Sequence, residues 1–143
     1  MQIAALTPSI TSAAALAAVQ AAVEHGRAMG KAVVAAVVDG GGDLMACLRA
    51  DGAFSVSIGI ARDKAYTAAV FGVASHELGQ TLSSSAILRD GIAMRPGVIL
   101  FAGGLPISVD GAVAGAIGVS GGSEDDDLAC AKAGLIALGL PAG

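Results

Sequence analysis

The sequence predicts an α+β domain in which an antiparallel sheet is flanked by helices, and three observations support this prediction. Its 143 residues match the usual size of one domain. Hydrophobic residues make up 55% of the chain and charged residues only 14%, which supplies enough apolar surface for a packed core. Short Val- and Ala-rich runs separated by glycine-rich turns alternate with longer runs at helical spacing. We therefore treat residues 1–143 as a single domain.

A first helix is predicted over about residues 11–29, after several Ser and Thr residues that can cap its start. Leu16, Val19 and Val23 recur at helical spacing, so this stripe is expected to face the core. His25 falls on the opposite side of the helix from Leu16 and Val19.

A run rich in Val and Ala follows over residues 31–39, and the glycine-rich segment 40–43 separates it from a second apolar run over 44–49. This pattern is typical of a β-hairpin. The glycine-rich segment lacks the GK[ST] of a phosphate-binding loop, and no helical pattern follows it, so we interpret it as a turn.

A second helix is predicted over about residues 55–73. Ile60, Lys64, Thr67 and Phe71 share one face of this helix. A lysine between apolar residues is unusual on a face that packs against a core, which makes Lys64 a candidate for a specific role.

The second half of the chain predicts a short helix at 75–78, a poorly patterned and mobile loop at 79–97, and a three-stranded meander. The predicted strands are 98–101, 107–109 and 112–119, with Asp110-Gly111 as the turn of the last pair. A terminal helix should follow to residue 138, with the acidic residues 124–127 in its first turn, where they complement the helix dipole.

Composition argues against two classes of partner. The net charge is −4, Trp is absent and no basic run exists, whereas a nucleic-acid-binding protein needs a basic surface. The apolar stretch 13–23 is too short to span a membrane, and Gln20 interrupts it. No Lys or Arg precedes Arg27, so a secretory signal is not expected and a cytoplasmic location is.

The high hydrophobic content also predicts a homo-oligomer. A lone small domain needs more polar surface than this composition offers, so other copies of the chain are expected to cover the excess. Cys47 and Cys130 are isolated in the sequence and are expected to be buried free thiols.

A polar set is predicted to gather at one end of the sheet. Arg49 and Asp51 follow the second strand, Lys64 lies on the next helix, and Gly103-Gly104 adjoins a later strand. Glycine N–H groups near cations suit a carboxylate or phosphate ligand. The alternative is a structural Arg–Asp pair beside glycines that are needed for their backbone conformation.

Other catalytic arrangements have weaker support. A triad of Ser75, His76 and Asp51 lacks the Gly-x-Ser-x-Gly elbow, and no partner is evident for Lys64 as a Schiff-base nucleophile. A metal site built on the two histidines lacks the HExxH pattern, because Gln80 occupies its last position.

Several motifs together resemble the GlcG/HbpS family over nearly the whole chain. They are VVDGGGDL at 37–44, RADGA at 49–53, KAYTA at 64–68, GGLPI at 103–107 and GAIGVSGG at 115–122. The family includes heme-binding HbpS-type proteins and the C-terminal domain of PduO-type proteins. The resemblance implies a profilin-like fold, homo-oligomers and a role in a catabolic operon, with heme as the leading cofactor.

The resemblance also implies site residues. His76-Glu77 resembles a PduO-type histidine–glutamate pair, so His76 is the candidate axial heme ligand and His25 the second choice. The full set of residues predicted to bind the ligand is Asp39, Arg49, Asp51, Lys64, Phe71, Gly103, Gly104 and Pro106.

Three functions follow as hypotheses. The first is a homo-oligomeric accessory protein that binds heme or a related tetrapyrrole. The second is a small catabolic enzyme acting on a carboxylated or oxygenated metabolite, with Asp51, Lys64 and His76 as catalytic candidates. The third is a structural or regulatory subunit that binds a protein partner.

Overall fold

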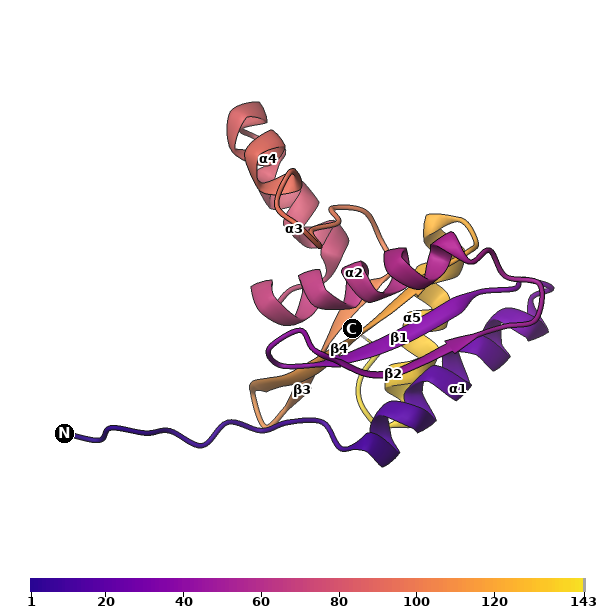
Figure 1. Ribbon diagram of the computed structural model, residues 1–143, viewed down its shortest axis with the longest axis horizontal. Coiled ribbons are helices and arrows are strands. Elements are labelled where there is room, and N and C mark those ends of the chain that lie inside the picture. The colour runs from indigo at the N-terminus through magenta and orange to yellow at the C-terminus, as the bar shows by residue number, and fades with distance from the viewer. Residues whose placement is uncertain (143) are drawn as a thin grey trace.

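The computed structural model describes residues 1–142 and confirms the α+β class: one antiparallel sheet has helices on both faces (Figure 1). The strand order is β2-β1-β4-β3. The strands are β1 (Val34–Asp39), β2 (Leu44–Arg49), β3 (Gly104–Val109) and β4 (Ala112–Ser120). One face carries α2 (Val56–Phe71), and the other carries α1 (Ser12–Ala28) and α5 (Glu124–Ala137).

The two faces of the sheet are packed differently. Branched side chains such as Val19, Ile107 and Ile117 fill the layer between the sheet and helices α1 and α5. On the α2 side the packed residues are mostly alanines, and the helix backbone lies very close to β4. A Cβ added at Gly118 would collide with the carbonyl oxygen of Ala61, so only glycine allows this approach.

Both predicted hairpins are present. The β1–β2 turn is held by Asp39, whose Oδ1 accepts hydrogen bonds from the N–H groups of Gly41 at 2.9 Å and Asp43 at 3.0 Å. The β3–β4 turn is the expected Asp110-Gly111 pair, with φ values of 52° and 80°.

The segment predicted as a loop at 79–97 is instead largely helical. It contains the second half of α3 (Ser75–Leu82) and all of α4 (Ala86–Ala93), which project from the body of the molecule (Figure 1). No side chain of α4 is buried. Sequence reasoning missed this helix because α4 has no inward-facing core stripe to reveal it.

The predicted strand 98–101 is wrong, so the sheet has four strands. This segment has no strand partner and runs beside α2, where side chains satisfy its backbone. The Thr67 hydroxyl accepts a hydrogen bond from the Ile99 N–H group at 2.9 Å and lies 3.0 Å from the Gly97 carbonyl oxygen. An apolar run alone does not distinguish a strand from a segment packed in this way.

Two burial predictions were also wrong. Leu16 is 53% exposed, because the inward face of α1 is instead lined by alanines together with Val19 and Val23. Cys47 is exposed on the edge strand β2, whereas Cys130 is a buried free thiol as predicted.

The two edges of the sheet differ. At the β3 edge the N–H group of Gly104 donates to the Ser75 hydroxyl at 3.0 Å, and Pro106 has no N–H group to offer. At the β2 edge the side chains are mostly exposed. Within residues 1–142, no helix has the length and apolar character that crossing a membrane requires.

Candidate functional site

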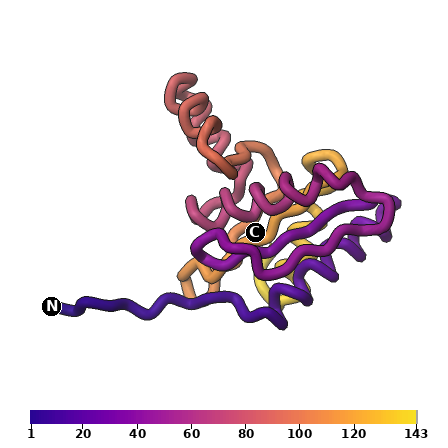
Figure 2. The backbone as a smooth tube through the Cα atoms, viewed as in Figure 1, coloured from indigo at the N-terminus to yellow at the C-terminus, as the bar shows by residue number. Residues whose placement is uncertain are grey.

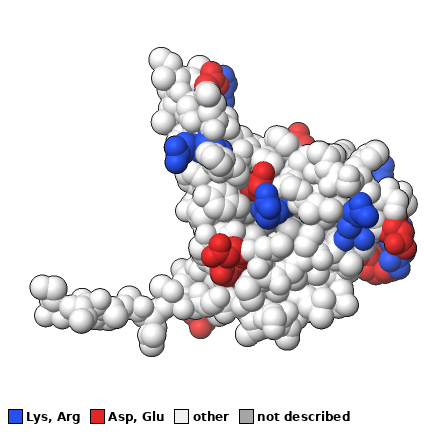
Figure 3. Space-filling model, viewed as in Figure 1, with Lys and Arg blue, Asp and Glu red and all other residues white. Residues whose placement is uncertain are grey.

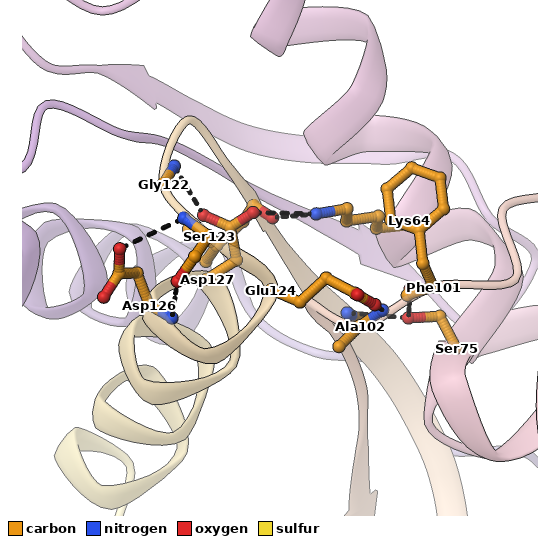
Figure 4. A network of polar contacts seen from close by, with 11 residues as sticks. Lys64, Ser75, Phe101, Ala102, Gly122, Ser123, Glu124, Asp126 and Asp127 are labelled. Atoms are coloured by element: carbon orange, nitrogen blue, oxygen red, sulfur yellow. Dashed lines mark hydrogen bonds and ion pairs between the residues drawn. The ribbon is translucent and has the colours of Figure 1, made fainter.

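Lys64 is buried and already paired. Its side chain is 2% exposed, and its Nζ lies 3.0 Å from Asp127 Oδ2 and 2.9 Å from the Val119 carbonyl oxygen (Figure 4). The ring of Phe101 lies over the ammonium group, 5.1 Å from its centre. Lys64 therefore joins α2 to the end of β4 and the start of α5.

Gly103 and Gly104 lie beside Lys64, as the sequence suggested, but in close packing. A Cβ on Gly103 would come within 2.8 Å of Lys64 Nζ, and Gly103 has a φ of 130° that favours glycine. A Cβ on Gly104 would collide with the Lys64 carbonyl oxygen. These glycines make room for the buried lysine.

The polar network around Lys64 fixes the start of α5 (Figure 4). Asp127 Oδ1 accepts from the Gly122 N–H group at 2.9 Å, and Glu124 Oε1 accepts from the Ala102 N–H group at 2.9 Å. Burial raises the pKa of Asp127 despite these hydrogen bonds. Hydrogen bonds from Ser123 lower the pKa of Asp126, with which Ser123 forms a capping box.

Arg49 and Asp51 lie elsewhere. Both are exposed, and neither takes part in an ion pair within residues 1–142, so the expected Arg–Asp pair is absent there. Arg49 lies on the edge strand β2, where it is the register partner of Val34 on β1. Gly104 belongs to the opposite edge strand, β3. Three strand spacings separate these edges, roughly 14 Å.

The remaining predicted residues lie in three places: the β1–β2 turn, the ends of α1 and α2, and a cavity beside β3. The Asp39 carboxylate is engaged in the β1–β2 turn. Phe71 is exposed at the end of α2. His25 is exposed in the last turn of α1. Pro106 and His76 line the same cavity, so the structure brings these two together.

This cavity, which we call the His76 cavity, has a volume of about 370 Å³. It lies between the α2–α3 junction, the β3 edge, α5 and the C-terminal segment. Its lining consists of Gly72, Val73, Ala74, His76, Glu77, Leu105, Pro106, Ser108, Leu128, Lys132, Leu135, Leu140 and Pro141. Sequence reasoning missed Lys132 and the apolar residues from α5 and the C-terminal segment.

His76 is the second residue of α3, and its ring is unusual in its bonding. The Nδ1 atom is buried and has no hydrogen-bond partner among residues 1–142. An unpaired buried polar atom costs about 1–3 kcal/mol, so such atoms commonly mark functional positions. Because Nδ1 is enclosed by protein while the residue lines the cavity, Nε2 is the ring nitrogen available to a ligand.

A second cavity of about 380 Å³ lies at the base of the N-terminal segment. It is mainly apolar and is lined by residues 8–11, Ala14, the β3–β4 hairpin and the C-terminal segment. Leu140 borders both cavities. Arg49, Asp51 and Lys64 line neither of them. Within residues 1–142, no group of three or more His, Cys, Asp or Glu side chains is arranged to hold a metal ion.

Comparison with known proteins identifies the family. The family model described as haem-degrading protein HbpS-like matches residues 10–136. The chain belongs to the HbpS-like family. The resemblance found in the sequence motifs is thereby confirmed.

This HbpS-like chain is similar in sequence to a bacterial relative and in structure to two solved proteins. An uncharacterised 15.0 kDa protein of Citrobacter freundii, encoded in the dhaT–dhaS intergenic region, is 38% identical over 104 residues, 72% of this chain and 73% of that protein. The crystal structure of HbpS has 36% identity and a TM-score of 0.87, covering 95% of this chain and 94% of that one. A PduOC structure crystallised as a heme complex has 29% identity and a TM-score of 0.82, covering 90% and 94% of the two chains.

Proposed function

We propose that this protein is a homo-oligomeric accessory protein that binds heme or a related tetrapyrrole in the His76 cavity. The observation that carries the proposal is the His76 ring, which lines the cavity and has a buried Nδ1 without a partner. The similar PduOC structure that contains heme supports the choice of ligand.

The residues present fit a heme group. Apolar residues of the cavity lining come from the α2–α3 junction and β3 (Val73, Leu105 and Pro106) and from α5 and the C-terminal segment (Leu128, Leu135 and Leu140), which suits an apolar macrocycle. Neutral imidazole is a common axial ligand of heme iron, so His76 Nε2 would hold the metal. When bound, the group supplies iron redox and gas-binding chemistry, and the cavity walls limit the access of water to it.

The volume of the His76 cavity also supports the proposed assembly of several copies of the chain. About 370 Å³ lies near the lower end of the range for small-molecule sites. It accommodates part of a porphyrin, and a second copy of the chain would cover the remainder.

Exposed apolar side chains support a homo-oligomer. The N-terminal segment runs away from the body as an extended arm that carries no charged side chain (Figures 2 and 3). Within it Ile3 is 91% exposed and Leu6 is fully exposed, and Ile87 on the projecting α4 is 90% exposed. Apolar side chains in such positions are typical of surfaces covered by another chain.

Titration with hemin, followed by the Soret band, tests the proposal. We expect a shifted Soret band with 1:1 stoichiometry per chain, lost in His76→Ala. His25→Ala is the matched control, because it removes the other histidine of the chain, and its spectrum should equal that of the wild type. An unchanged spectrum in His76→Ala would contradict the ligand assignment, and no Soret shift in the wild type would contradict heme binding itself.

A further inference from the structure

Lys132 is distinguished from the other basic residues by its surroundings. Five of the eight Lys and Arg side chains form ion pairs with Asp or Glu. Within residues 1–142, the three without such a pair are Arg49, Arg95 and Lys132. Of these three, only Lys132 lines the His76 cavity. It therefore places a positive charge, without an ion pair among the described residues, in a cavity whose lining is mostly apolar but includes Glu77.

The helix that carries Lys132 directs it toward the cavity. Leu128, Lys132 and Leu135 follow each other at spacings of four and three residues, and all three line the His76 cavity. The acidic residues of the first turn of α5 do not neutralise Lys132, because Asp126 and Asp127 pair with Lys31 and Lys64 instead. The positive charge remains available to a ligand.

The start of α3, which also lines the cavity, has one feature that favours an anion and one that repels it. Ala74, the N-cap residue just before α3, has no side chain that can accept a hydrogen bond, so the first N–H groups of α3 have no side-chain cap. The carboxylate of Glu77, on the same wall, has the same charge as an anionic ligand and repels it. One cation and one nearby anion suit a singly charged group better than a dianionic phosphate.

We propose that Lys132 binds a carboxylate group of the ligand, so that the His76 cavity selects apolar molecules bearing a carboxylate. This inference rests on the proposed function and deepens it. In a tetrapyrrole the partner is a propionate side chain, held at Lys132 while His76 contacts the centre of the ring. Glu77 opposes this contact and limits the affinity.

The experiment compares metal-free protoporphyrin IX with its dimethyl ester, each titrated by fluorescence. In the ester both carboxylates are neutral, and the metal-free ring removes any contribution of iron ligation by His76. We expect Lys132→Gln to weaken binding of the free acid roughly tenfold, the size of a charge-assisted hydrogen bond at a partly exposed site. The same substitution should leave binding of the ester unchanged.

Three further variants complete the design. Lys132→Arg keeps the charge and should retain most of the affinity for the free acid. Arg95→Gln removes an equivalent charge outside the cavity and should change nothing. Glu77→Gln should tighten binding of the free acid, the opposite sign from Lys132→Gln.

The outcomes separate this inference from the proposed function. Equal binding of acid and ester, or equal losses in Lys132→Gln and Arg95→Gln, would overturn the role of Lys132 while leaving hemin ligation by His76 intact. Lys132-dependent binding of the free acid without a His76-dependent Soret band would support the inference and overturn the iron ligand. If neither porphyrin nor hemin binds, both proposals fail.

Discussion

Replacing Asp127 with Asn tests the buried ion pair that joins α2 to α5. The substitution keeps the size of the side chain and an oxygen that can accept from the Gly122 N–H group. It removes the negative charge that lies 3.0 Å from Lys64 Nζ. The ammonium group would then remain buried without a carboxylate partner, with contacts only to the Val119 carbonyl oxygen and the Phe101 ring.

The expected cost follows from that geometry. Removing one member of a buried pair leaves a charge without compensation, which destabilises a protein by about 3–5 kcal/mol. This is a large fraction of the roughly 5–15 kcal/mol that stabilises an ordinary domain. The double variant Lys64→Met with Asp127→Leu removes both charges and should regain most of the loss, because apolar replacements of buried pairs are often neutral or stabilising.

Urea unfolding followed by far-ultraviolet circular dichroism measures these differences, since the chain has no Trp and one Tyr. Protein concentration must be held constant, because the proposed assembly would contribute to stability. A cost below about 1 kcal/mol for Asp127→Asn, or a double variant no more stable than the single one, would refute the reasoning. Ligand binding retained by the folded double variant would also contradict the predicted ligand role of Lys64.

Three further predictions concern the thiol, the glycines and the arm. Burial raises the pKa of the Cys130 thiol from 9.0 to about 11, so its contribution to stability is complete below pH 9 and is lost as the pH rises toward 11. Unfolding free energies from urea curves across this range should fall by about 2–3 kcal/mol more for the wild type than for Cys130→Ala, and parallel pH dependences would contradict this. Gly118→Ala should prevent stable folding, because the added Cβ would collide with the Ala61 carbonyl oxygen. Gly59 has open space around it in α2, so Gly59→Ala should increase the free energy of unfolding by about 0.5–1 kcal/mol and raise the thermal midpoint. Deletion of residues 1–6 should shift the assembly toward smaller species in analytical ultracentrifugation, and an unchanged distribution would exclude the arm from the interface.

Local sequence signals predicted much of the fold. Thr11 caps α1, the acidic residues 124–127 lie in the first turn of α5, and Asp110-Gly111 forms the last hairpin turn, because each of these signals acts over a few residues. The segment 98–101 was misassigned because its backbone partner is Thr67, about thirty residues away. That partner cannot be identified from the composition of the segment itself.

The site was harder to predict than the fold, and for a similar reason. Arg49 and Gly104 were placed near one end of the sheet by their positions relative to strand ends, which says nothing of how many strands lie between them. His76 was predicted as a ligand only from the family resemblance. Lys132 gave no local signal, because its role depends on α3 and β3, which approach it only after the chain has folded.

The difference between the two sheet edges restricts how copies of the chain could associate through their strands. At one edge, a proline and the hydroxyl of Ser75 withdraw the donors that an incoming strand would need. Strand-to-strand pairing between copies must then use β2 on both sides, a self-complementary contact that closes on itself after two chains. Copies that pair in this way would form finite particles and not open-ended fibres.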